Sequence, residues 1–113
     1  MTPPPARKRR PRGPRERLAE ALLALAGQQG RIASHEEKSW ASITFAGTRH
    51  RVELVFEGAE AVERGECFIA FLPEHEFAIP GQLVADAAVV EVTSIAQPPQ
   101  LTVRCEVLLL EEG

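Results

Sequence analysis

Several residue types are scarce in this 113-residue chain, and each scarcity excludes a class of protein. The sequence holds two cysteines, one tryptophan and no tyrosine. Two cysteines are too few for the disulfide framework of a small secreted domain, and no Cys-X-X-Cys pair or Cys/His cluster indicates structural zinc. No apolar run approaches the roughly 18 residues of a membrane-spanning helix. We therefore expect reduced thiols and a cytoplasmic protein.

Catalytic and cofactor motifs are missing as well. The sequence contains no nucleophile elbow, no phosphate-binding loop, no dinucleotide-binding glycine motif and no recognisable Ser/His/Asp order. We therefore expect no cofactor and favour a non-catalytic role.

Charge is distributed unevenly along the chain. Residues 1–17 carry seven basic side chains and one acidic side chain, a net charge of +6, whereas residues 18–113 carry six basic and fifteen acidic side chains, a net charge of -9. Because the first residues combine proline with positive charge, we predict a disordered basic tail over residues 1–13 and a single domain over residues 14–113. The tail is either simply solvated or contacts nucleic acid or another anionic partner. The candidate contact residues are Arg7, Lys8, Arg9, Arg10, Arg12, Arg15 and Arg17.

Any nucleic-acid binding by the tail would be sequence-independent. Cationic side chains that neutralise phosphates give salt-sensitive binding. Recognition of single-stranded bases needs stacking aromatics, and the tail has none. The acidic remainder of the chain would also repel a polyanion. The nucleic-acid signal is therefore a weak one.

A first helix is predicted over residues 14–26. Pro14 suits the first helical position, and Leu18, Leu22 and Leu25 recur at helical spacing. The same stretch resembles a secretory signal peptide, with a basic start and an apolar segment. However, Glu20 interrupts that segment, so a folded amphipathic helix is favoured.

A second helix is predicted over residues 59–72 and ends at Pro73. Its apolar arc comprises Ala61, Val62, Gly65, Phe68, Ile69 and Leu72. Cys67 and Phe71 lie on the opposite arc, where they are covered by the following loop or meet another chain.

The first hairpin is predicted around Gly47-Thr48, a pair suited to a two-residue type II′ turn. Its strands span residues 39–46 and 49–57, and a short strand over 31–34 precedes them. Residue pairs whose numbers sum to 95 lie opposite each other. This register places Phe45, Ile43, His50 and Val52 on one mostly apolar face, which we predict to be the core face.

The second hairpin is predicted from strands 83–96 and 101–110, separated by Pro98-Pro99. Residue pairs whose numbers sum to 197 place Val90 and Val92 opposite Val107 and Cys105 on a second apolar face. The order α-β-β-β-α-β-β predicts an α+β fold: a single antiparallel β-sheet of four to five strands, made of two hairpins, with two helices packed on one face. The strand order stays open.

The open side of this sheet would be unusually apolar for a solvated surface. Trp40, Val55, Leu108 and Leu110 fall there, and Cys67 and Phe71 lie on the outer face of the second helix. We therefore predict a partner-binding or self-association surface that includes Trp40, Val55, Cys67, Phe71, Leu108 and Leu110.

Three histidines are the groups whose ordinary pKa lies near neutrality. His35 and His75 each neighbour glutamates but lack the spacing that presents two metal ligands together, so we expect solvated loop residues and no metal site. His50 is expected at a partly exposed flank of the first hairpin. Residues 73–81 should form either a long ordered connection or a bulged edge segment, which Phe77 and Ile79 pin to the core.

Three functional hypotheses follow. The first is a small non-catalytic interaction module that contacts a protein partner or a second copy of itself. The second is an accessory nucleic-acid-binding protein acting through its basic tail. The third is a small enzyme or metal-binding protein centred on residues 73–81.

Overall fold

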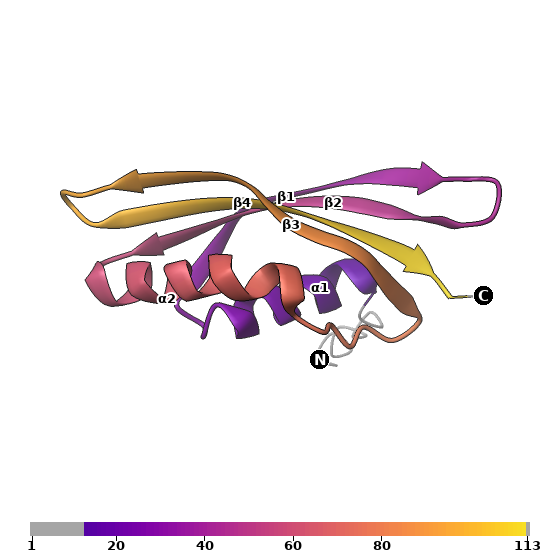
Figure 1. The fold of residues 1–113 in the computed structure, drawn as a ribbon, viewed down its shortest axis with the longest axis horizontal. Coiled ribbons are helices and arrows are strands. Elements are labelled where there is room, and N and C mark those ends of the chain that lie inside the picture. The colour runs from indigo at the N-terminus through magenta and orange to yellow at the C-terminus, as the bar shows by residue number, and fades with distance from the viewer. Residues whose placement is uncertain (1–12, 113) are drawn as a thin grey trace, which may run out of the picture.

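A computed structural model describes residues 13–112. Its elements, in chain order, are α1 (Pro14–Leu25), β1 (Gly30–Ala41), β2 (Ala46–Glu57), α2 (Ala59–Phe71), the 3-10 turn η1 (Leu72–Glu74), β3 (Gln82–Ile95) and β4 (Gln100–Glu111). All neighbouring strands are antiparallel, in the order β1-β2-β4-β3. Both helices lie on one side of the twisted sheet (Figure 1), which confirms the predicted α+β fold. The sheet has four strands, because the segment expected at 31–34 and the start of the one expected at 39–46 form one continuous β1.

Both helices form where the apolar spacing predicts them. The Gly13 amide donates a hydrogen bond to Glu16 Oε1 at 2.8 Å, which satisfies a free N–H group at the start of α1. Leu18 and Leu22 are fully buried. On α2 the buried side is the predicted arc, with Phe68 at its centre, and Pro73 ends the helix in a 3-10 turn.

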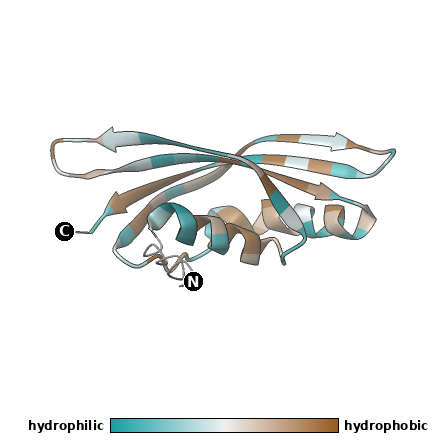
Figure 2. Cartoon of the chain, turned by 180° about the vertical axis from the view of Figure 1, so that it is seen from behind, coloured by the Kyte–Doolittle hydropathy of each residue, from teal (hydrophilic) through white to brown (hydrophobic). Residues whose placement is uncertain are grey.

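The core lies between the helices and the two central strands. Residues of β2 and β4 alternate, and the helix-facing set is fully or almost fully buried. It comprises Val52, Leu54 and Phe56 from β2 and Leu101, Val103, Cys105, Val107 and Leu109 from β4. Burial raises the pKa of the Cys105 thiol to about 12, so this cysteine is an inert apolar residue, as predicted. The strongest apolar colouring of the sheet runs along the C-terminal half of β4 (Figure 2).

The first hairpin turns four residues earlier than predicted. Its strands end at Ala41 and resume at Ala46, and paired residue numbers sum to 87 over most of the ladder. Ser42 closes the turn: its amide donates to the Phe45 carbonyl at 2.7 Å, and its hydroxyl accepts from the Phe45 amide at 3.0 Å. Ile43 and Phe45 therefore project from an exposed turn and are not core residues.

Gly47 lies within β2 and not in the predicted turn, for a packing reason. A Cβ atom at this position would collide with the carbonyl oxygen of Leu109 on β4. Gly47 is not among the glycines with positive φ, so no left-handed turn conformation requires it. The glycine instead permits the close approach of two strands.

The second hairpin forms with a different register. Next to its turn, paired residue numbers sum to 195 and not to the predicted 197. Two β-bulges, between Val89 and Glu91 and between Val84 and Asp86, each lower this sum by one toward the start of β3. The predicted sum of 197 would set Glu91 opposite Glu106, two like charges, whereas Glu91 in fact lies opposite Arg104. The corrected register replaces a like-charge contact with an attractive one.

Residues 75–81 connect η1 to β3 as an ordered segment. Ile79 is buried, Phe77 packs against the core, and the Gln82 amide donates to the Ile79 carbonyl at 3.0 Å. This arrangement confirms the predicted pinning of the segment. Within residues 13–112, neither helix has the length and apolarity that crossing a bilayer requires.

Candidate interaction surfaces

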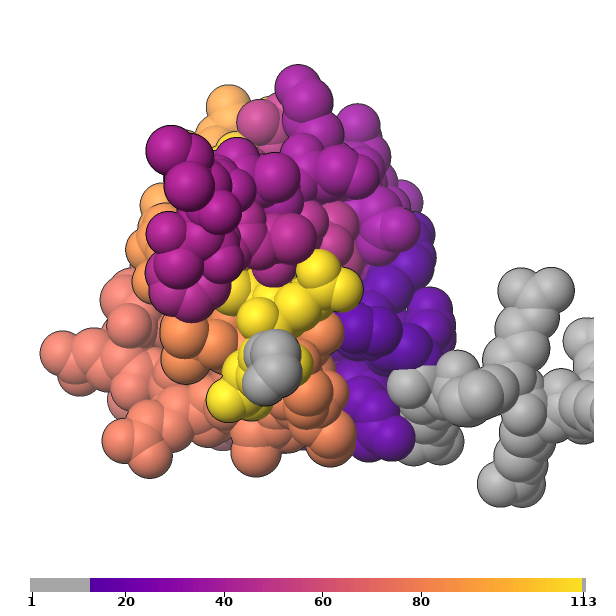
Figure 3. All heavy atoms as spheres, turned by 90° about the vertical axis from the view of Figure 1, so that its right-hand side faces the viewer, coloured from indigo at the N-terminus to yellow at the C-terminus, as the bar shows by residue number. Residues whose placement is uncertain are grey.

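The open face of the sheet carries an apolar row at one end. Trp40, Gly47, Leu110 and Leu83 are successive cross-strand partners on β1, β2, β4 and β3. Because direct partners share a face, three apolar side chains and one glycine lie together there. In the end view, the β1–β2 hairpin overhangs the C-terminal end of β4 (Figure 3).

The structure distributes the six predicted partner-binding residues over different degrees of exposure. Val55, Leu108 and Leu110 are only 6%, 9% and 7% exposed within the single chain. Trp40 and Cys67 are half-buried. Phe71 is 52% exposed, so the loop after α2 does not cover it. Most accessible apolar area therefore lies elsewhere.

That area is concentrated on β3, an edge strand. Of the seven exposed large apolar residues among those described, four belong to β3. They are Leu83 (51% exposed), Val90 (49%), Val92 (44%) and Ile95 (46%). Sequence reasoning placed Val90 and Val92 in the core, because it could not show that α2 packs over β2 and β4 and that β3 lies beyond them at the edge of the sheet.

The two edges of the sheet differ in chemistry. Edge strands are commonly protected from pairing with other chains by charged residues, proline or bulges. β1 carries Arg31 and, in its regularly paired portion, Glu36, Glu37 and Lys38. β3 contains no lysine, arginine or proline, and its two bulges leave Glu91–Ile95 regularly paired with β4. This short segment is the least protected edge of the sheet.

Ion pairs occupy the middle of the open face. Arg104 on β4 contacts Glu53 on β2 at 3.1 Å and Glu91 on β3 at 2.8 Å. These two carboxylates raise the pKa of Arg104. Arg51 contacts Glu106 in the same way, at 2.9 Å. Most charged groups here are thus matched within the chain.

A histidine pair lies on the helix-facing side near α1. His35 Nε2 is 2.9 Å from His50 Nδ1, and Glu37 Oε2 is 3.8 Å from the same His50 atom. His50 is 1% exposed, which corrects its predicted position at a partly exposed flank. His35 lies within β1 and not in a loop. Sequence reasoning missed the pair because the hairpin register was wrong.

Arg15, one of the predicted tail contacts, binds within the domain. Its guanidinium donates to the His35 carbonyl at 2.6 Å and lies 3.5 Å from Glu37. Arg17 lies on α1 and also has an interaction partner. The remaining predicted contacts, Arg7, Lys8, Arg9, Arg10 and Arg12, lie outside the described residues.

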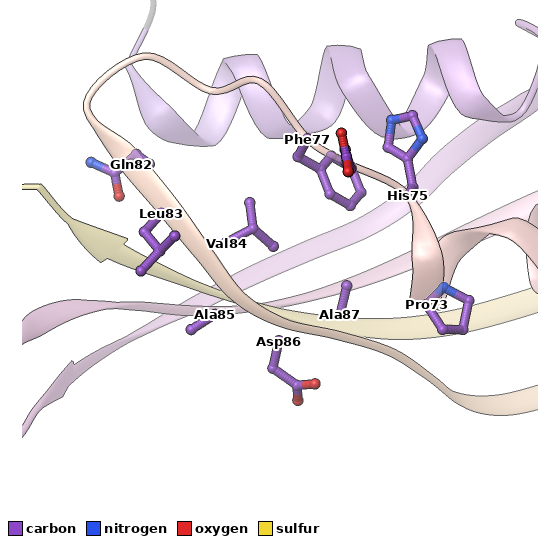
Figure 4. Close-up of a pocket in the computed structure, with 10 residues that line it drawn as sticks. Pro73, His75, Phe77, Gln82, Leu83, Val84, Ala85, Asp86 and Ala87 are labelled. Carbon is purple, nitrogen blue, oxygen red and sulfur yellow. The ribbon is translucent and has the colours of Figure 1, made fainter.

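The segment 73–77 and the start of β3 border a shallow groove of about 390 Å³. Phe77 and Val84 point into it, whereas Asp86 points away (Figure 4). The His75 ring packs edge-on against Phe77, with centroids 4.6 Å apart. Among residues 13–112, no three His, Cys, Asp or Glu side chains are arranged to hold a metal ion.

These features define a small α+β protein with one covered and one uncovered sheet face and one apolar edge. No protein-family model and no curated protein matches the chain. A chain in a solved structure described as the virion of a native gene transfer agent particle has a similar fold, with a TM-score of 0.52 and 12% sequence identity. The alignment covers 81% of this chain and 84% of that chain. At this identity the similarity extends to the fold alone.

Proposed function

We propose that this protein is a small, non-catalytic interaction module that assembles with a protein partner or with further copies of itself. The observation that carries the proposal is the set of exposed apolar side chains on β3, a strand that protects its edge with neither lysine nor proline. Apolar side chains scattered singly over a surface need no explanation, but four on one edge strand indicate a contact surface.

A further observation supports this proposal. The chain of similar fold comes from a structure described as a virion particle, and a particle of this kind is an assembly. The groove beside Phe77 is lined by His75, Glu76 and Asp86 among other residues, and Asp86 points away from it (Figure 4), so we favour the interaction module over the third hypothesis.

Sedimentation velocity of the full chain, from low micromolar to near-millimolar concentration, tests self-assembly. We expect the mean sedimentation coefficient to rise with concentration. A single monomeric species over the whole range would contradict self-assembly. The proposal would then require a different protein as partner.

A further inference from the structure

We infer that the partner of β3 is β3 of a second copy, paired antiparallel about a two-fold axis at Val92, so that two four-stranded sheets become one sheet of eight strands. This inference rests on the proposed function and specifies its contact surface. Edge-to-edge pairing supplies main-chain hydrogen bonds, and the side chains on either side of the junction set the specificity.

The apolar core of the sheet is open at this edge. Ile32, Leu54, Val103 and Val92 form one row of cross-strand partners over all four strands, on the helix-facing side. Leu54 and Val103 are fully buried, whereas Val92 at the end of the row is 44% exposed. A two-fold axis perpendicular to the sheet keeps the helix-facing sides together. The second Val92 therefore continues the same apolar row.

Charge determines which strand fits. Pairing β3 with β1 of another copy would set Val92 and its uncharged neighbours against Glu36, Glu37 and Lys38, whose charges would lose water and gain no ion pair from those neighbours. The segment Glu91–Ile95 has one charged residue, and Arg104 of the same chain already neutralises it at 2.8 Å. The segment is thus better matched by another copy of itself.

Charge also selects the register. If the axis passed through Glu91, two carboxylates would lie directly opposite each other, which is unfavourable in an antiparallel pair. With the axis at Val92, Glu91 lies opposite Thr93 of the second copy, and Val92 lies opposite itself. An isologous contact of this kind closes after two copies and does not propagate into a filament.

The first test substitutes Val92→Lys, which places two ammonium groups side by side at the axis. Sedimentation velocity should show association weakened at least about tenfold, since like charges juxtaposed in an interface cost more than the 1.4 kcal/mol that corresponds to tenfold. Ser39→Lys on the exposed β1 edge is the matched control and should associate like the wild type. Circular dichroism of both variants confirms that they fold.

The second test measures the register by disulfide formation in a Cys67→Ser background, where the remaining Cys105 is buried and unreactive. Opposed residues of an antiparallel pair have Cα atoms about 4.5–5.5 Å apart, which suits a disulfide. Val92→Cys should therefore form a covalent dimer under mild oxidation. Ser94→Cys should not, because two copies of residue 94 would be roughly 14 Å apart.

The outcomes separate this inference from the proposed function. If the wild type associates and Val92→Lys associates equally well, β3 pairing is wrong while self-assembly stands. If Ser94→Cys cross-links and Val92→Cys does not, the axis at Val92 is wrong. If the wild type is monomeric at every concentration, self-assembly itself fails and this pairing fails with it.

Discussion

His35 and His50 are diagonal neighbours on one face of the β1–β2 ladder, with 2.9 Å between His35 Nε2 and His50 Nδ1. A contact this short between two ring nitrogens requires one to donate and the other to accept a hydrogen bond. One proton shared between His35 Nε2 and His50 Nδ1 therefore suffices for the contact. If both of these nitrogens were protonated, two N–H groups would point at each other. Burial, above all, lowers the pKa of both rings, and for His35 it falls to about 4, with Arg15 and His50 as further causes.

This pair should make the protein sensitive to acid. In the unfolded chain both histidines titrate near their ordinary pKa of 6.5, so between pH 6.5 and about 4 the unfolded state binds more protons than the folded state. The stabilisation is fully present above pH 6.5 and is lost as the pH falls toward about 4. We expect a loss of about 2 to 3 kcal/mol from His35, after allowing for solvent around its half-buried ring.

Urea unfolding at a series of pH values measures this loss. His35→Gln keeps a hydrogen-bonding side chain without a titrating ring and should flatten the profile between pH 6.5 and 4. His75→Gln is the matched control, because His75 is exposed, and its profile should follow the wild type. An unchanged profile in His35→Gln would contradict the assigned cause.

Gly47→Ala tests whether this glycine serves strand packing. The added Cβ would collide with the Leu109 carbonyl, and backbone atoms of a central strand cannot easily move aside. We expect the free energy of unfolding to fall by at least about 2 kcal/mol. Thr48→Ala, at the next residue of the same strand, is the control and should cost less. A Gly47→Ala protein as stable as the wild type would show that the two strands do not approach so closely.

Ser42→Ala tests the observed turn. The substitution removes the hydroxyl that accepts hydrogen bonds from the Thr44 and Phe45 amides at 3.3 and 3.0 Å. We expect a loss of about 1 kcal/mol, the usual net worth of a hydrogen bond, which corresponds to a fall in Tm of about 4–8 °C in a domain of this size. Ser39→Ala, outside the turn, should leave the melting curve in place. The reverse result would favour a turn elsewhere.

Removal of residues 1–12 tests the nucleic-acid hypothesis. Five of the seven predicted contact residues lie in this segment, while Arg15 is bound to His35 and Glu37. If the tail binds phosphates, deletion should abolish binding to duplex DNA at low salt and remove about four to five from the slope of log affinity against log salt. Equal binding by the full and shortened chains would dismiss the tail.

Titration with zinc tests the metal hypothesis for residues 73–81. The described residues contain no group of three ligating side chains, and the His75 ring packs against Phe77. We expect the NMR signals of His75 to stay unchanged at stoichiometric zinc. A shift in the His75 signals that saturates at one equivalent would revive a metal site at this loop.

Part of this molecule can be read directly from its sequence. The leucines at helical spacing define α1, and the arc around Phe68 defines α2, because a helix buries every third or fourth side chain whatever it packs against. Alternation of buried and more exposed residues from His50 to Leu54 likewise shows which side of β2 is buried. These local periods are sufficient for the fold class of two helices on one antiparallel sheet.

The registers and the exposed surfaces were decided by tertiary structure. Side chains of a strand alternate between faces with a period of two. The turn of the first hairpin lies four residues earlier than predicted, an even number, so each residue of β2 still lies on its predicted face. Alternation alone therefore could not reveal the wrong register. The hydroxyl of Ser42 and the close approach at Gly47 fixed the actual turn. Whether Val92 is covered depends on where α2 lies over the assembled sheet. The sequence thus determined which residues are apolar, and only the packed chain decided which of them face solvent.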